Sequence, residues 1–318
     1  MHIKKTNRFF LFAVIVGLVS MFALDSLPKQ WGISDLIPYL LVFFASLLAI
    51  KRDKAKFFDV LPYNKKISAR EIILIIALTL LMFPVSNVFS EIGTYLTGDI
   101  LDVGVAKMQE SGGDSLFGQV FVIAVIPAVF EELYFRGYFF AGYRKYRGAR
   151  TAIILSSILF GLFHMNFQQF LYAMVLGIVI AVIRELTGSM WAGMLYHFVN
   201  NGMAAIVGYI GDTYKSAGAI IEKYGPISNL TFEDTGHTIY SIVMFVVAIP
   251  VMFVILKAIA KGRGREDDFK NFFKGNVPEE KERLISASLI TGIILYLLMC
   301  LVIAYAFKSG AFVHALEA

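Results

Sequence analysis

Six polar side chains in otherwise apolar stretches of the sequence are of the types that carry out hydrolysis. A carboxylate and an imidazole within reach of one water molecule form a general-base arrangement. A histidine and an asparagine can together donate hydrogen bonds to an oxyanion. The sequence therefore predicts a water-activating site formed by Glu131, Glu132, Arg136, His164, His197 and Asn201.

Helical spacing sorts most of these residues into pairs. Glu132 and Arg136 are four positions apart, so they share a helix face and can form an ion pair. Glu131 points about 100° away from Glu132 on a helix, which leaves its carboxylate for another role. His197 and Asn201 are also four positions apart, and we expect both to address one point in the interior of a helical bundle.

Two apolar neighbours bear on the geometry of this site. Pro127 lies one turn before Glu131 and lacks an amide hydrogen, so it predicts a kink beside the carboxylates. Such a kink would open a small water-filled cavity. Phe160 lies four positions before His164, which places an aromatic ring beside the imidazole.

The composition identifies the surroundings of the site. Hydrophobic residues make up 58% of the 318 residues and charged residues 17%, and the mean hydropathy is +0.69. Soluble domains have about a quarter charged residues. Since one aqueous core cannot hide this apolar excess, the composition excludes a soluble enzyme and a disordered chain. It predicts an all-α, polytopic integral membrane protein of about eight or nine transmembrane helices with an intramembrane catalytic bundle.

Apolar runs near transmembrane length recur along the whole chain. We divide it into N-terminal transmembrane helices (1–115), a catalytic core (116–211) and C-terminal transmembrane helices (212–318) with a cytoplasmic loop at 258–283. No small-residue cleavage site follows Leu24, so we expect the first run to stay as an anchor. The runs lie at about 9–24, 37–50, 71–90, 116–143, 151–165, 168–184, 190–211, 238–257 and 284–307.

The distribution of cations predicts the orientation of these spans. With a cytoplasmic N-terminus, the inner segments hold 23 of the 29 Lys and Arg residues, including those of 51–70, 144–150 and 257–283. The net charge of +5 is thus an orientation signal rather than a sign of a nucleic-acid partner. We expect a multi-pass protein of the cell membrane. The single cysteine, Cys300, and the short loops fit a bacterial plasma membrane.

One inner segment has two interpretations. The stretch around Phe269, Phe272 and Phe273 combines aromatic and charged residues. It fits a segment that lies on the anionic face of the membrane. A solvated loop fits it equally well.

Four local motifs occur in order within one hydrophobic block. They are EExxxR at 131–136, FxxxH at 160–164, TGSMW at 187–191 and HxxxN at 197–201. The ordered set resembles the CAAX protease and bacteriocin-processing family of intramembrane endopeptidases, whose eukaryotic members are the type II CAAX prenyl endopeptidases. The resemblance covers about 116–206, which is less than a third of the chain.

The resemblance implies a role for each candidate residue. Glu131 would be the general base that activates water, assisted by His164. His197 and Asn201 would form the oxyanion site. The remaining two residues would complete and hold the catalytic helix: Glu132 and Arg136.

A cofactor is the open part of this prediction. Glutamate and histidine are plausible zinc ligands, and members of the family have been labelled metalloproteases. The chain has no HExxH motif, and its carboxylates and imidazoles come from separate helices. Arg136 beside the carboxylates also disfavours a divalent cation. We therefore expect no cofactor, with zinc as the alternative.

The predicted function is hydrolysis of a peptide bond in a membrane-associated protein or peptide. The alternative is a non-catalytic bacteriocin-immunity, membrane scaffold or transport protein that uses the same polar cluster. The expected partners are membrane lipid and a protein or peptide substrate, with a prenylated protein and a leader peptide both open. No nucleic acid is expected, and the sequence does not specify an oligomeric state.

Overall fold

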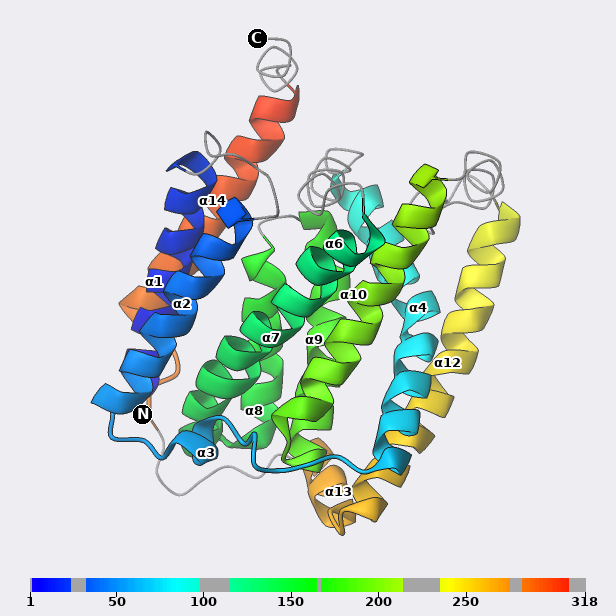
Figure 1. Ribbon diagram of the computed structural model, residues 1–318, viewed down its shortest axis with the longest axis horizontal. Coiled ribbons are helices and arrows are strands. Elements are labelled where there is room, and N and C mark those ends of the chain that lie inside the picture. The colour runs from blue at the N-terminus through cyan, green and yellow to red at the C-terminus, as the bar shows by residue number, and fades with distance from the viewer. Residues whose placement is uncertain are drawn as a thin grey trace.

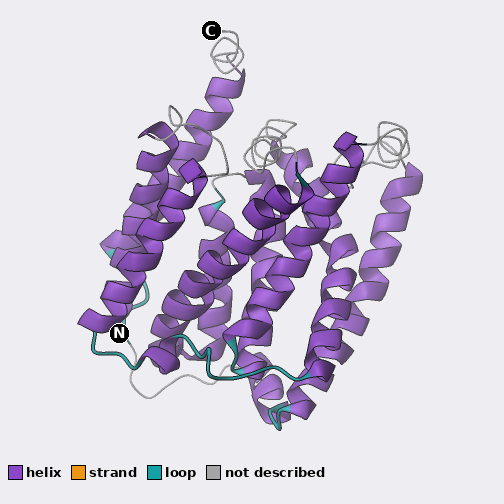
Figure 2. Cartoon of the chain, in the orientation of Figure 1, coloured by secondary structure: helices purple, strands orange, loops and turns teal. Residues whose placement is uncertain are grey.

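The computed structural model describes residues 2–23, 33–97, 115–164, 167–213, 235–274 and 282–308. In these ranges the regular secondary structure is helical and no strand occurs, as Figure 1 and Figure 2 show, so the all-α prediction is confirmed for them. The elements are α1 (Ile3–Ala23), α2 (Ile33–Arg52), α3 (Phe57–Val60), α4 (Ala69–Thr97), α6 (Leu116–Val120), the π-helix η2 (Phe121–Val125), α7 (Ile126–Glu132), the π-helix η3 (Leu133–Phe139), α8 (Phe140–Phe163), α9 (Phe167–Thr187), α10 (Met190–Thr213), α12 (Thr235–Gly262), α13 (Glu266–Lys274) and α14 (Ala287–Lys308).

Four helical stretches are long and apolar enough to cross a membrane. They are Ala69–Leu96, Leu116–Phe163, Gln169–Thr187 and Ile239–Gly262, and a shorter apolar helix runs over Ala287–Val302. Long apolar helices of this kind are typical of integral membrane proteins. The expected total of eight or nine spans goes beyond these four and stays a prediction.

The longest of these stretches is interrupted at Gly148. This residue has φ 79° and ψ 172°, a conformation that only glycine adopts readily. The kink separates Leu116–Arg147 from the part of α8 that leads to His164. It lies in the segment 144–150, where the cations predict a turn between two apolar runs.

The bundle is arranged around α9, which packs against α4, α8, α10 and α12. In α9, 67% of the most apolar stretch is buried inside the bundle. In α12, only 17% of the most apolar stretch is buried. The outer face of α12 exposes Val246, Val247 and Val254. A broad apolar face exposed on a long helix is what contact with lipid requires.

The segments rich in lysine and arginine gather at one end of the bundle. In Figure 1 the N-terminus, α3 and α13 lie at the bottom, and the end of α14 lies at the top. Lys5 forms a 2.5 Å ion pair with Asp53, which joins the start of α1 to the segment after α2. This arrangement agrees with the predicted grouping of 51–70 with the described part of 257–283. Which side of the membrane this end faces stays a prediction.

The stretch around Phe269, for which the sequence allows a segment on the membrane face or a solvated loop, forms the short helix α13. Phe269 is buried, and its ring lies 5.0 Å from that of Phe253 on α12. The loop interpretation is therefore wrong for the described part of this segment, because its aromatic residue has a partner in the bundle. The side chains of Phe272 and Phe273 lie outside the described residues.

Candidate active site

Two π-helical segments flank the short helix that carries both glutamates. Glu131 and Glu132 are the last residues of α7, with η2 before it and η3 after it. A π turn spans one residue more than an α turn, and such turns are frequent at functional sites. Pro127 lies in the first turn of α7, directly after η2. The irregularity expected at this proline is therefore accompanied by a π turn on each side of α7.

The side chain of Asn201 compensates for the missing amide hydrogen of Pro127. In an α-helix, the amide at position 127 would donate to the carbonyl of Ile123, and proline cannot do so. Asn201 Nδ2 donates to that carbonyl oxygen at 3.1 Å. Asn200 in turn donates to Asn201 Oδ1 at 3.1 Å. One amide hydrogen of Asn201 is thus directed at the turn before α7. The sequence instead predicts that the side chains of Asn201 and His197 address the same point.

Glu132 is the junction of three elements of the site. Its Oε1 accepts a hydrogen bond from Arg136 Nη1 at 3.0 Å, and His197 Nδ1 lies 3.0 Å from the same oxygen. Arg136 Nη2 also donates to the carbonyl of Gly177 on α9 at 3.1 Å. The side chains of Glu132 and Arg136 are fully buried. The ion pair predicted from their spacing is present, and it links α9 and α10 to the glutamate-bearing segment.

Two glycines allow the helices to approach this junction closely. A Cβ atom at Gly177 would lie 3.0 Å from Arg136 Nη2 and 3.1 Å from Phe160 Cδ1. A Cβ atom at Gly193 would lie 3.0 Å from Glu132 Oε2. All three distances are tighter than ordinary van der Waals contact. The ion pair is therefore enclosed by backbone from α9 and α10.

Glu131 lies beside this junction and has different partners. Tyr39 Oη donates to Glu131 Oε1 at 2.8 Å. Glu131 Oε2 lies 3.9 Å from His197 Nε2, which is too long for a direct hydrogen bond. Within the described part of the chain this buried oxygen has no hydrogen-bond partner. His197 therefore lies between the two carboxylates, with one ring nitrogen directed toward each.

Phe160 separates the two histidines of the site. Its ring meets His164 edge-on at 4.9 Å and His197 edge-on at 5.7 Å between centroids. The guanidinium carbon of Arg136 lies 4.3 Å from the same ring centroid, a cation–π contact. His164 Nδ1 lies 2.9 Å from the Phe160 carbonyl oxygen, so Nδ1 is the protonated nitrogen and Nε2 is the acceptor.

Tyr39 is the residue of this site that the sequence did not indicate. It belongs to α2, outside all four motifs, and α2 packs against α7 and η3. Its ring also lies 6.0 Å from that of Phe130, next to Glu131. A tyrosine in an apolar run carries no spacing signal toward a residue on another helix. Only the packing of the two helices brings them together.

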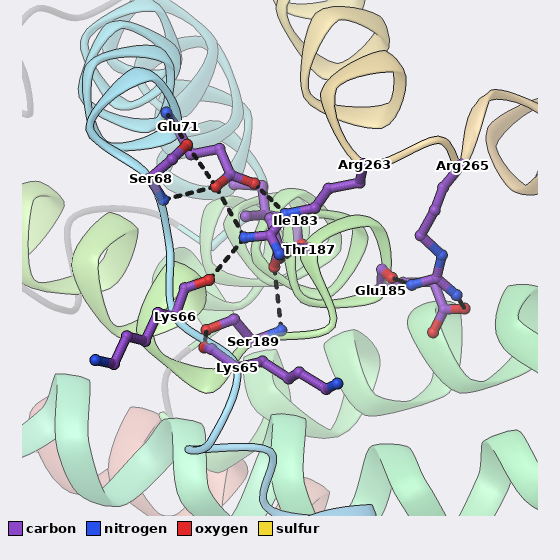
Figure 3. A network of polar contacts seen from close by, with 10 residues as sticks. All are labelled: Lys65, Lys66, Ser68, Glu71, Ile183, Glu185, Thr187, Ser189, Arg263 and Arg265. Carbon is purple, nitrogen blue, oxygen red and sulfur yellow. Dashed lines mark hydrogen bonds and ion pairs between the residues drawn. The ribbon is translucent and has the colours of Figure 1, made fainter.

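The TGSMW motif connects α9 to α10 and holds a loop against them. Gly188 has φ 63°, which allows the tight turn between the helices. Ser189 Oγ donates to the carbonyl of Lys65, as Figure 3 shows. Trp191 Nε1 donates to the carbonyl of Tyr63 at 2.9 Å. Burial, followed by the nearby Glu132 carboxylate, raises the pKa of Tyr63 to about 12, so its hydroxyl stays neutral.

The donor groups of the site do not fit a metal ion. In the described ranges, no three His, Cys, Asp or Glu side chains are arranged to hold one. The carboxylate that lies closest to a histidine nitrogen, that of Glu132, already bonds the cationic Arg136.

The six residues predicted for the site therefore lie in one region of the chain. Residues 113–203 match the family model described as type II CAAX prenyl endopeptidase Rce1-like. At the level of family, this Rce1-like region is similar to CAAX-protease-type membrane endopeptidases. No curated protein and no solved structure matches the chain.

The Rce1-like region contains every residue predicted for the site. It places Glu132 in contact with both Arg136 and His197, Glu131 on the other side of His197, and His164 behind the ring of Phe160. Tyr39 enters from outside the matched residues. The Rce1-like region is thus completed by a helix from the N-terminal part of the chain.

Proposed function

We propose that the protein is an intramembrane endopeptidase in which Glu131 activates a water molecule. The observation that carries this proposal is the placement of the Glu131 carboxylate. One oxygen is held by Tyr39, and the other lies 3.9 Å from His197 Nε2 in a buried site. A water molecule placed to one side of the line that joins these two atoms would reach both at ordinary hydrogen-bond length. The family match supplies the reaction class.

In the proposed reaction Glu131 takes up one proton and later gives it away, so it ends as it began. The carboxylate accepts a proton from water as the water oxygen attacks the peptide carbonyl carbon, and the carbonyl oxygen becomes an oxyanion. The C–N bond then breaks, and the proton on Glu131 passes to the leaving nitrogen. His164 Nε2, an acceptor, assists in removing the proton from water.

The other residues have stabilising roles in this proposal. In its imidazolium form His197 donates from Nε2 to the oxyanion, because Nδ1 is directed at Glu132. The second amide hydrogen of Asn201 provides another donor, since the first is used on Ile123. Arg136 holds Glu132 in place, so that Glu132 orients His197 rather than attacking substrate.

The proposed location is the cell membrane of a bacterium, with the cation-rich end toward the cytoplasm. The substrate is a membrane-associated protein or peptide. The matched family is described as prenyl endopeptidases, so a prenylated peptide is the first substrate to test and a leader peptide the second.

A cleavage assay tests the proposal. Protein purified in a neutral detergent is incubated with a prenylated CAAX peptide and with a leader peptide, with and without a strong chelator. We expect wild-type protein to cleave one of them at the same rate in both conditions, and His164→Ala to reduce that rate. Loss of cleavage in chelator with recovery in zinc would establish the metalloprotease alternative instead.

A non-catalytic role is the second candidate function. The contacts of Glu132, Arg136 and Asn201 all join helices, which a scaffold, transport or bacteriocin-immunity protein would also need. Such a protein cleaves neither peptide, and its binding or protective activity survives Glu131→Gln.

A further inference from the structure

A cavity of about 410 Å³ lies between the beginning of α4 and the end of α12, outside the active site. Its charged walls are Lys66, Arg70 and Arg263, together with Glu71. Its apolar walls include Leu74 and Ile259. The lining of the cavity therefore combines basic and apolar side chains.

The single carboxylate of this cavity is already neutralised. Arg263 donates from Nε to Glu71 Oε1 at 2.5 Å and from Nη2 to Oε2 at 2.8 Å. The Ser68 amide also donates to Glu71 Oε2 at 2.8 Å, which completes a capping box at the start of α4. Figure 3 shows this pairing beside the Lys66 carbonyl, which receives a further hydrogen bond from Arg263.

Two cations of the cavity have no such partner. Lys66 and Arg70 are exposed, and neither forms an ion pair with another described residue. Both lie next to the N-terminus of the 29-residue helix α4, where the helix dipole adds a partial positive charge. A Cβ atom at Gly262 would lie 3.8 Å from Arg70 Nη1, so the Arg70 guanidinium lies close to the end of α12. The cavity thus attracts an anion that none of the described residues provides.

The position of the cavity indicates where that anion comes from. The helices on both sides, Ala69–Leu96 and Ile239–Gly262, are candidate membrane spans, and both end at the cavity. This is the level at which a bilayer's hydrocarbon core gives way to its headgroups. Basic pockets between transmembrane helices at this level bind anionic headgroups.

We propose that this cavity binds the phosphate headgroup of an anionic phospholipid. Lys66 and Arg70 contact the phosphate, and the acyl chains follow the apolar wall of Leu74 and Ile259. Phosphate chemistry alone would also suit a soluble phosphate ester, but the apolar wall favours a ligand with acyl chains. The inference depends on the membrane location of the two helices and is independent of catalysis.

The loop beside the cavity is hydrogen-bonded to the start of the helix that carries His197. The residues just before the cavity, Tyr63 and Lys65, accept hydrogen bonds from Trp191 and Ser189 at the start of α10. α10 also carries His197. A bound headgroup therefore orders the loop that α10 holds, and we expect lipid to raise the thermal stability of the whole chain.

Lipid binding by the full-length protein tests the proposal. Protein in a neutral detergent is titrated with phosphatidylglycerol, with phosphatidylcholine and with glycerol phosphate, and bound ligand is counted by native mass spectrometry. Each of Lys66→Ala and Arg70→Ala should weaken phosphatidylglycerol binding about five-fold, and the double variant about thirty-fold. Lys65→Ala removes the same charge from the same loop but not from the cavity, and it should bind like wild type.

Three outcomes would overturn the proposal. The double variant could retain wild-type affinity, or Lys65→Ala could weaken binding as much as Lys66→Ala. Glycerol phosphate could bind as tightly as phosphatidylglycerol, which would assign the cavity to a soluble phosphate ester. Because Lys66 and Arg70 are exposed, the variants should unfold at the wild-type temperature in the absence of lipid. This measurement is the control for their folding.

Discussion

Tyr39 and Glu131 are joined by a 2.8 Å hydrogen bond across 92 positions of sequence. The phenol fixes one oxygen of the carboxylate and leaves the other directed toward His197. A helix outside the Rce1-like region thereby sets the orientation of the proposed base.

Tyr39→Phe tests this positioning role. The ring contact with Phe130 is kept, but Glu131 loses a hydrogen bond of the charged type, worth about 1.5–3 kcal/mol. We expect kcat to fall about ten- to a hundred-fold, with little change in KM. Tyr305→Phe, at a site that is 75% exposed, should leave both constants unchanged. A Tyr39→Phe enzyme with wild-type kcat would contradict the role.

The Glu132–Arg136 pair should be essential for stability. Removal of one partner leaves a buried charge alone, which costs about 3–5 kcal/mol. We therefore expect Arg136→Met to lower the unfolding temperature in detergent markedly, and Glu132→Gln together with Arg136→Met to restore part of the loss. If the double variant is no more stable than the single one, the two side chains are not coupled.

A pair of glycine substitutions tests the packing around that ion pair. Gly177→Ala places a methyl group 3.0 Å from Arg136 and should destabilise by about 1–3 kcal/mol. Gly202→Ala, on α10, meets its nearest neighbour at 3.8 Å and should be neutral or stabilising by up to about 1 kcal/mol. Thermal unfolding compares the two variants. Equal effects would contradict a tight contact at Gly177.

The two functions assigned to Asn201 can be separated. Asn201→Ala should lower both stability and activity, because the Ile123 carbonyl and the oxyanion each lose a donor. Adding Pro127→Ala supplies a backbone amide one helical turn after Ile123, so stability should recover while activity stays low. Recovery of activity as well would show that Asn201 acts only on the helix.

Helical spacing explains why part of this site could be predicted. A helix fixes the relation of Glu132 to Arg136 and of Phe160 to His164, and the structure contains both contacts. The turn near Gly148 was also predictable, because cations interrupt the apolar sequence there.

Other features depend on contacts between helices, which spacing cannot specify. The partner of Tyr39 is set by how α2 packs on α7. The target of Asn201 depends on the carbonyl that Pro127 leaves without an amide donor, and the π turns beside it shift the helical register. A periodicity of 3.6 residues does not indicate either of them.

The comparison of Glu131→Gln with Glu266→Gln tests the central claim most directly. Both replace one carboxylate by an amide, but Glu266 lies on α13, away from the site. Single-turnover cleavage should be about a hundred- to ten-thousand-fold slower in Glu131→Gln, at an unchanged unfolding temperature, and unaffected in Glu266→Gln. Cleavage by Glu131→Gln at the wild-type rate would contradict the assignment of Glu131 as the base.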